Sequence, residues 1–201
     1  MRKRCLIIFY KNPELGKVKT RLAATVGDEM ALAIYWKLAS HTRNVVESVA
    51  VDKVVYYSHF VDREDNWSAQ SFAKKLQQGE DLGEKMSNAL AETFANEYSS
   101  TCIIGTDCFE LNQQIVEDAF RKLETADAVV GPAKDGGYYL LGMNKFMPSL
   151  FQDKEWSTSS VLDQTISDLE NLKATFAILP ALNDIDLESD LPEELRKQFA
   201  R

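Results

Sequence analysis

The sequence predicts an α/β fold in three layers, with a mostly parallel central sheet covered by helices on both faces. Short apolar stretches of strand length alternate with longer segments of helical periodicity along almost the whole chain. The first apolar stretch, residues 5–10 of the expected strand 4–10, is continuously apolar, as in strands that are buried on both faces. Alternating strands and helices of this kind are typical of parallel sheets joined by crossover helices.

Each expected element has a local signal. Residues 28–49 place apolar side chains at the spacing of one helical face, and residues 53–60 are rich in β-branched and aromatic types. Ser157 or Thr158 is expected to cap a helix that runs to about residue 169. The expected strands are 4–10, 53–60, 101–105, 128–131, 138–143 and 173–179; the expected helices are 28–49, 83–98, 112–124, 157–169 and 191–200.

Length and composition narrow the class of protein. A chain of 201 residues suits a single domain spanning residues 1–201. The net charge of -8 argues against nucleic acid or an anionic membrane as the main partner. The three cysteines have no metal-binding or disulfide spacing, which favours buried thiols in a reducing compartment.

No targeting or membrane segment is expected. A basic start precedes the first apolar run, but that run ends at Lys11 and is too short for a signal peptide. No stretch approaches the roughly eighteen apolar residues of a membrane span. The expected location is therefore the cytoplasm.

The first candidate site is the basic loop that follows the first strand. Gly16 in this loop lets backbone amides approach a ligand closely. Ligands of such sheets bind beyond the carboxyl ends of the strands, which favours phosphate binding over a solvated basic loop. The loop matches neither a Walker A nor a dinucleotide-binding glycine motif. Its cations, accompanied by the single acid Glu14, are Lys11, Lys17, Lys19 and Arg21.

The second candidate is Asp107, directly after the short buried strand 101–105. A carboxylate at this position could hold Mg²⁺ or Mn²⁺ together with substrate phosphates. The alternative is an aspartate that caps the next helix or forms an Asx turn.

Two further loops contain acidic residues near glycines or near each other. Asp135-Gly136-Gly137 is a strong hairpin signal; its glycines also permit close ligand approach, with Asp135 accepting sugar hydroxyls. In the alternating segment 184–191, Asp186 could be a second metal ligand, whereas Asp190 is expected to cap the final helix.

Smaller features have similar alternatives. Gly83 opens a predicted helix whose N-terminus could approach a base or a phosphate, or it marks an ordinary helix entry. Trp156 is expected to be an aromatic anchor beside a helix cap. His41 and His59 have no Ser or Cys partner nearby in the sequence, which argues against a hydrolase triad.

Taken together, these motifs resemble a family of bacterial GT-A-like, glycosyltransferase-like proteins of the selenodomain-associated transferase type. The family in turn is similar to guanylyltransferases that activate phospholactate. This chain departs from the family pattern at Phe109, where proline is common after the Asp-Cys pair. The matching blocks run in family order over nearly the whole chain: 11–22, 78–86, 104–108, 131–143, 156–161 and 184–191.

The resemblance implies a nucleotide-diphospho-sugar transferase fold of the GT-A, Rossmann-like kind. It implies Asp107 as the principal ligand of Mg²⁺ or Mn²⁺ and Asp186 as a possible second ligand. The phosphate contacts that it implies are Lys11, Lys17, Lys19 and Arg21.

The leading functional hypothesis is a metal-dependent transferase that uses a nucleotide sugar and a small acceptor. Asp107, Asp135 and Lys19 are its expected catalytic residues, and Asp135 orients the donor sugar or the acceptor. The alternatives are a nucleotidyltransferase that releases pyrophosphate from a nucleoside triphosphate, and a non-catalytic nucleotide-binding protein. The expected substrate-binding residues are Lys11, Gly16, Lys17, Arg21, Gly83, Gly136 and Gly137.

Overall fold

A single seven-stranded sheet organises the protein, whose computed structural model describes residues 3–199. Its strand order is β3-β2-β1-β4-β6-β5-β7. Strand β6 is antiparallel to β4 and β5, and the other pairs are parallel. The predicted fold class is therefore confirmed. The strands are β1 Arg4–Tyr10, β2 Asp52–Tyr57, β3 Ala73–Leu76, β4 Ser100–Ile104, β5 Ala128–Pro132, β6 Tyr138–Met143 and β7 Phe176–Ile178.

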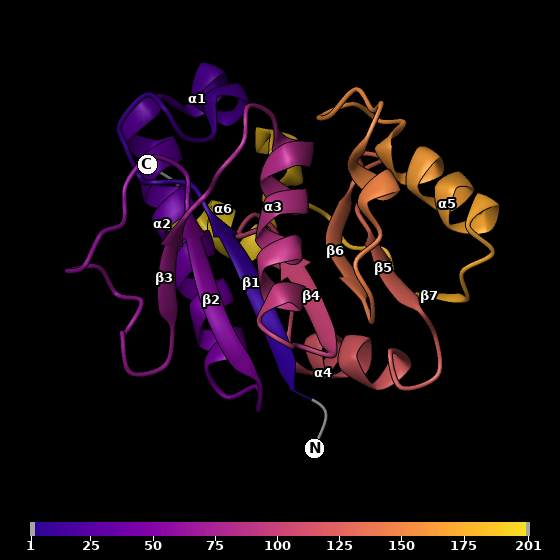
Figure 1. Ribbon diagram of the computed structural model, residues 1–201. Helices are drawn as coiled ribbons and strands as arrows, with labels where there is room; N and C mark the ends of the chain where they lie inside the picture. The colour runs from indigo at the N-terminus through magenta and orange to yellow at the C-terminus, as the bar shows by residue number, and fades with distance from the viewer. Residues whose placement is uncertain (1–2, 200–201) are drawn as a thin grey trace.

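Helices cover both faces of this sheet (Figure 1). One face packs against α2 and α4, and the other packs against α3, α5 and the short 3₁₀ helix η1. A smaller apolar cluster joins α1, α2 and α6. The helices are α1 Thr20–Val26, α2 Asp28–Glu47, α3 Leu82–Ala95, α4 Gln113–Lys122, η1 Pro148–Phe151, α5 Val161–Asn171, η2 Glu188–Asp190 and α6 Glu193–Phe199.

Strand β1 lies at the centre of the parallel part of the sheet, with β2 on one side and β4 on the other. The side chains of residues 5–8 are fully buried. Because successive side chains of a strand point to opposite faces, a strand covered by two layers must be apolar at every position. This explains the continuous apolar run that predicted the strand.

One strand and one α-helix were not expected from the sequence. Strand β3 has the sequence AKKL and is a short edge strand, so it lacks the apolar signal of a buried strand. Helix α1 begins after Lys19, which provides no side-chain cap. Both elements are determined by their neighbours instead of by local sequence.

Two expected helix starts were wrong. Helix α5 begins at Val161, with Ser160 at the N-cap position, because the preceding residues form a turn. Asp190 does not cap the last helix: its carboxylate accepts hydrogen bonds from the backbone N–H groups of Asp186 and Leu187. The last helix was expected to reach Ala200, which lies outside the described residues.

The predicted hairpin is present between β5 and β6. Asp135 closes its turn by accepting a hydrogen bond of 2.9 Å from the backbone N–H of Gly137. Gly136 has a φ of 92°, a left-handed conformation that favours glycine. The three cysteines are buried and free, as the sequence indicated. Among residues 3–199 no helix has the length and apolar character needed to cross a membrane.

Gly142 provides a test of packing within the sheet. A Cβ atom there would lie 2.6 Å from the Cys102 sulfur and 2.7 Å from a methyl group of Val129. Gly142→Val should therefore lower the free energy of unfolding by about 1–3 kcal/mol through overpacking. Urea denaturation followed by circular dichroism measures this loss.

Gly105→Ala is the matched control for this substitution. A Cβ atom on Gly105 meets nothing within 4 Å, so the free energy of unfolding should change by less than about 1 kcal/mol. Equal losses from both substitutions would contradict the packing argument.

Candidate functional site

A pocket of about 680 Å³ lies beyond the carboxyl ends of the parallel strands. This volume falls in the range of about 300–1,000 Å³ that is typical of small-molecule sites. Residues from the loops that follow β1 and β4 and from the β5–β6 hairpin line it. Its other walls come from the start of α3 and from residues 156–161 and 184–186. The carboxyl ends of β1 and β4 lie at the upper edge of the sheet in Figure 1.

An ion-pair cluster centred on Lys19 forms part of the pocket lining. The ammonium of Lys19 lies 3.0 Å from Oδ1 of Asp107 and 3.1 Å from Oδ1 of Asp186. The Lys19 side chain is only 4% exposed, whereas the two carboxylates are 43% and 42% exposed. One buried cation therefore joins two carboxylates that face the pocket.

The environment of Lys19 favours the protonated, charged form of its side chain. Burial by itself would lower the pKa of its ammonium, but the neighbouring carboxylates of Asp107 and Asp186 raise the pKa above its ordinary value. The backbone of Lys19 has φ 49° and ψ 43°, a left-handed conformation that is uncommon for a residue other than glycine. Such conformations cluster at functional sites, where surrounding contacts enforce them.

Backbone pairing brings the two carboxylates together. Segment 182–185 pairs with Ala133 and Cys108 through isolated β-bridges. The backbone N–H of Ile185 also donates a 3.0 Å hydrogen bond to the carbonyl oxygen of Asp107. Ile185 is buried, and the alternation of an extended segment places Asp184 and Asp186 on the opposite side, where both line the pocket.

The environment of Asp184 favours its protonated form. Burial, followed by the nearby Asp107 carboxylate, raises the pKa of Asp184 to about 7, and the ammonium of Lys19 only partly offsets this. Near neutral pH this carboxyl group is therefore partly protonated and can donate a hydrogen bond as well as accept one.

Lys11 is positioned by its backbone. The Tyr35 hydroxyl accepts a hydrogen bond of 3.0 Å from the Lys11 N–H and donates one of 2.6 Å to the Lys11 carbonyl oxygen. The buried Asn12 side chain accepts hydrogen bonds from the backbone N–H groups of His59 and Phe60. The first loop is thereby fixed to helix α2 and to the end of β2, and Lys11 lines the pocket.

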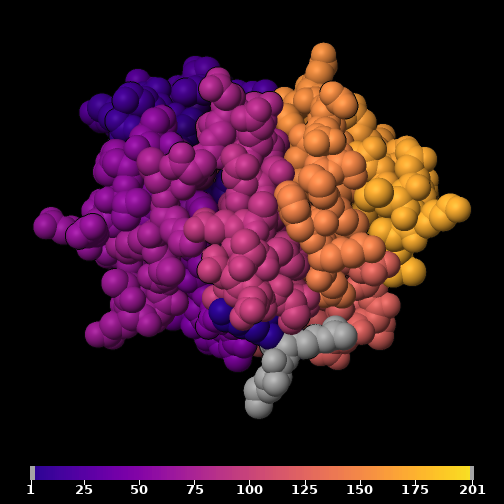
Figure 2. Space-filling view, viewed as in Figure 1, coloured from indigo at the N-terminus to yellow at the C-terminus, as the bar shows by residue number. Residues whose placement is uncertain are grey.

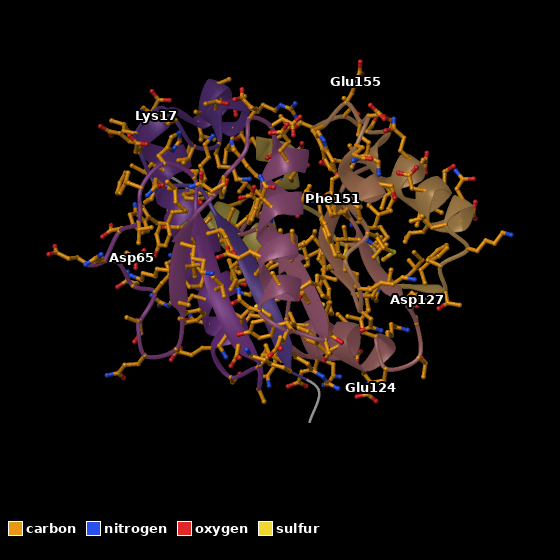
Figure 3. All side chains as sticks on the ribbon, in the orientation of Figure 1. Lys17, Asp65, Glu124, Asp127, Phe151 and Glu155 are labelled. Carbon is orange, nitrogen blue, oxygen red and sulfur yellow. The ribbon has the colours of Figure 1, made fainter. Side chains whose placement is uncertain are left out.

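The remaining basic-loop residues divide between the pocket and the surface. Arg21 lines the pocket, is 69% exposed and lies 3.8 Å from Oδ2 of Asp186. Lys17 does not line it: its ammonium pairs with Glu14 at 2.8 Å, and its side chain lies at the outer edge of the molecule (Figure 3). Gly16 also lies outside the pocket lining, with φ 72° in the turn that precedes Lys17.

Two glycines of the candidate site contact another pocket wall instead of lining the pocket. A Cβ atom on Gly83 would lie 2.1 Å from the indole nitrogen of Trp156, and one on Gly136 would lie 2.1 Å from the carbonyl oxygen of Ser159. Both positions therefore need glycine so that the loop around Trp156 can pack closely. Asp135 and Gly137 do line the pocket.

The surface of α3 lies next to that of the later chain. In Figure 2 the magenta surface, which includes α3, borders directly on the orange surface of the later chain. On its other side the indole of Trp156 stacks on Phe151 of η1, with ring centroids 6.4 Å apart. This aromatic wall is therefore fixed from two sides.

The donor set is compatible with a divalent ion that also contacts substrate phosphates. Within residues 3–199 no group of three or more His, Cys, Asp or Glu side chains is arranged to hold a metal alone. Mg²⁺ usually takes one or two carboxylates and completes its shell with phosphate and water. Asp107 and Asp186, joined by one ammonium, fit that requirement.

Several lining residues lacked a strong signal in the sequence. Lys85 and Tyr138 lie within the matching blocks 78–86 and 131–143, although neither was singled out as a site residue. Tyr35 comes from a helix whose pattern indicates only amphipathic packing, and Ser58 follows β2 with no motif around it. Their approach to the pocket depends on tertiary contacts, so only the position of each chain segment relative to the sheet edge could have identified them.

Comparison with known proteins identifies the family of the chain. The family model "Uncharacterized protein conserved in bacteria (DUF2064)" matches residues 39–158, which include Asp107 and the β5–β6 hairpin. No curated protein matches the chain.

Solved structures share the fold over almost the whole chain. A protein of Desulfovibrio desulfuricans G20, provisionally described as a nucleotide-diphospho-sugar transferase, has a TM-score of 0.87 at 29% identity and covers 98% of this chain and 91% of its own. Inositol-1-phosphate CTP transferase of T. maritima has a TM-score of 0.63 at 12% identity and covers 100% of this chain and 96% of its own. The 4-diphosphocytidyl-2C-methyl-D-erythritol synthase of Anaerococcus prevotii DSM 20548 has a TM-score of 0.63 at 10% identity. It covers 100% of this chain and 97% of its own.

The last two likenesses concern the fold alone, since their identities are so low. Together with the D. desulfuricans protein they confirm the family resemblance and the nucleotide-diphospho-sugar transferase fold expected from the sequence. These relatives are described as transferases, in agreement with the expectation of an enzyme.

The raised pKa of Asp184 predicts a specific pH dependence of stability. The folded protein holds this proton up to a pKa of about 7, whereas the ordinary value is 3.8. The folded state therefore binds more protons than the unfolded chain between these values, and stability falls as pH rises through that window. Asp184→Asn, which resembles the protonated form, should remove about 1–3 kcal/mol of this loss.

Urea titrations of both proteins at pH 5 and pH 8 in EDTA measure the difference. The wild-type protein should lose stability relative to Asp184→Asn as the pH rises. Parallel behaviour of the two proteins would show that Asp184 is ionised in both states.

Proposed function

We propose that this chain, which belongs to the DUF2064 family of bacterial proteins, is a metal-dependent transferase that uses a nucleotide-sugar donor. The observation on which this depends is the cluster in which Lys19 joins Asp107 and Asp186 beside the basic loop. Cations and metal-binding carboxylates at one end of a pocket of this size suit a diphosphate.

The balance of charge in the pocket supports a metal requirement. Its four lysines and arginines face four aspartates, of which Asp184 is partly protonated near neutral pH, so without an added cation these groups carry a net charge of at most about +1. An anionic diphosphate therefore needs further positive charge to bind strongly. The basic lining residues are Lys11, Lys19, Arg21 and Lys85, and the acidic ones are Asp107, Asp135, Asp184 and Asp186.

The proposed reaction is displacement of the nucleoside diphosphate from the anomeric carbon of the donor sugar by a hydroxyl group of the acceptor. The bond from the anomeric carbon to the diphosphate oxygen breaks, the acceptor oxygen forms a bond to that carbon, and the hydroxyl proton of the acceptor is released to water. Lys11, Lys19 and Arg21 stabilise the charge that develops on the departing diphosphate. Mg²⁺ or Mn²⁺, held by Asp107 and Asp186, would supply Lewis-acid stabilisation of the same charge.

Asp135 has the position to orient hydroxyl groups. One of its oxygens is used by the Gly137 N–H, which leaves the other oxygen for the ligand. In the proposed reaction this carboxylate accepts a hydrogen bond from the donor sugar or from the attacking hydroxyl.

Nucleotidyl transfer is the second candidate, favoured by the fold likeness to a CTP transferase. In that reaction an acceptor oxygen attacks the α-phosphate of a nucleoside triphosphate and pyrophosphate leaves. The same cations and carboxylates would stabilise the transition state. The absence of the usual glycine-rich nucleotidyltransferase loop supports the sugar donor instead.

Product analysis separates the two reactions. We expect the protein to release a nucleoside diphosphate from one member of a nucleotide-sugar panel in Mn²⁺, measured by anion-exchange chromatography. Release of pyrophosphate from a nucleoside triphosphate, with no turnover of nucleotide sugars, would establish the second candidate.

Substitution of Asp107 tests the site assignment. Asp107→Ala should lower kcat/KM by a factor of about 10³ or more, since it removes a ligand of the metal and a partner of Lys19. It should also abolish the Mn²⁺-dependent part of the thermal shift that a bound nucleotide produces. The circular dichroism spectrum should remain that of the wild type.

Lys17→Ala is the matched control in the same loop. Its ammonium pairs with Glu14 outside the pocket, so kcat/KM should change by less than about threefold. Nucleotide binding that survives Asp107→Ala and ignores Mn²⁺ would instead indicate a non-catalytic nucleotide-binding protein.

A further inference from the structure

The carboxylates of Asp107 and Asp186 already face cations of the protein. Oδ1 of Asp107 lies 3.0 Å from the Lys19 ammonium, and Oδ1 of Asp186 lies 3.1 Å from it. The other oxygen of Asp186, Oδ2, lies 3.8 Å from the guanidinium of Arg21. A divalent ion held by both carboxylates therefore has to take an oxygen of Asp186 that already faces Lys19 or Arg21.

The two cations differ in how readily they can move away. Arg21 is 69% exposed and its contact with Asp186 is long, so its guanidinium can turn to solvent at little cost. Lys19 is 4% exposed and donates a hydrogen bond of 3.1 Å to Asp186. Its backbone is held as well, since its carbonyl oxygen accepts a 2.8 Å hydrogen bond from the N–H of Ala23. Lys19 is therefore the cation with which an incoming ion has to compete.

Lys19 has no other full counter-charge nearby. Among the described residues 3–199, its ion pairs go to Asp107 and Asp186 alone. Asp184 lies close enough for Lys19 to act on its pKa, but burial keeps that carboxyl group partly protonated near neutral pH. A buried ammonium without a counter-charge is strongly unfavourable. An ion that takes both carboxylates therefore leaves Lys19 in need of another anion.

A phosphate group of the ligand can be that anion. Lys19 lines the pocket together with Lys11 and Arg21, so its ammonium lies beside the end of the pocket where the basic loop contributes its charges. Phosphate oxygens accept charge-assisted hydrogen bonds from ammonium groups. The same ammonium can thus pair with the carboxylates or with the diphosphate.

We propose that Lys19 couples the binding of the divalent ion to the binding of the diphosphate. In the free protein its ammonium neutralises Asp107 and Asp186 and keeps their affinity for Mg²⁺ or Mn²⁺ low. The ammonium pairs with the diphosphate when the ion takes these carboxylates, so each ligand strengthens the binding of the other. The inference rests on the proposed function, because it takes Asp107 and Asp186 as the metal ligands.

The first test is Mn²⁺ binding to the full chain without nucleotide, measured by electron paramagnetic resonance of the unbound ion. Lys19→Met keeps a long side chain but removes the charge, so the Kd for Mn²⁺ should fall by about tenfold or more. Lys19→Arg keeps the charge and should bind Mn²⁺ within about threefold of the wild type. Unchanged or weaker binding by Lys19→Met would overturn the proposal.

Two further variants support this comparison. Lys17→Met removes a charge from the same loop, but that ammonium pairs with Glu14 at 2.8 Å outside the pocket. The Kd for Mn²⁺ should therefore change by less than about twofold. Lys19→Gln is the alternative if circular dichroism shows that Lys19→Met does not fold: it is neutral, can still donate hydrogen bonds to the carboxylates, and should also bind Mn²⁺ more tightly.

The coupling itself is measured with whichever of ADP, CDP, GDP and UDP binds best. Isothermal titration calorimetry gives its Kd in EDTA and in excess Mn²⁺. The ratio of the two constants should be at least about tenfold smaller in Lys19→Met than in the wild type, because no ammonium has to change partners. The metal–nucleotide complex that forms in solution is common to both proteins and cancels. Equal ratios would contradict the coupling.

Asp107→Ala separates this inference from the proposed function. If Mn²⁺ binds the wild type and is lost in Asp107→Ala, while Lys19→Met binds no more tightly, the coupling fails and the proposed function stands. If neither the wild type nor Lys19→Met binds Mn²⁺ with any of the four diphosphates present, both fail.

Discussion

The burial of one ammonium group sets the arrangement of the whole site. Lys19 is almost inaccessible to solvent and remains charged because Asp107 and Asp186 lie on either side of it. Removing one partner of a fully buried pair costs about 3–5 kcal/mol, and less here because both carboxylates reach the pocket. The loop after β1, the end of β4 and the segment after β7 must therefore meet at one point.

The order of strands in the sheet brings these three segments together. Strands β1 and β4 are parallel neighbours, so their carboxyl ends place Lys11 and Asp107 at the same edge. Segment 182–186 follows the edge strand β7 and crosses back to pair with Cys108, which brings Asp186 to the same place. The functional groups thus come from three distant parts of the chain, and the strand order brings them together.

Much of this could be predicted from the sequence because its signals are local. The buried strand β1, the hairpin at Asp135 and the position of Asp107 after a short apolar run all have local patterns. The separation of Lys17 from Lys19 could not be predicted, since it depends on a left-handed backbone and on the tertiary partners of each ammonium. Gly83 was expected to approach a ligand, but its missing side chain makes room for Trp156.

The ammonium of Lys19 also determines which carboxylate oxygens around it remain available to a ligand. Oδ1 of Asp107 is shielded from solvent beside Lys19, so the exposed part of this side chain, which includes its other oxygen, is what remains for a ligand. Asp186 is shared in the same way between Lys19 and Arg21. Lys19 therefore lies where the basic loop meets the two carboxylates, and the groups that can stabilise charge on a ligand are concentrated around it.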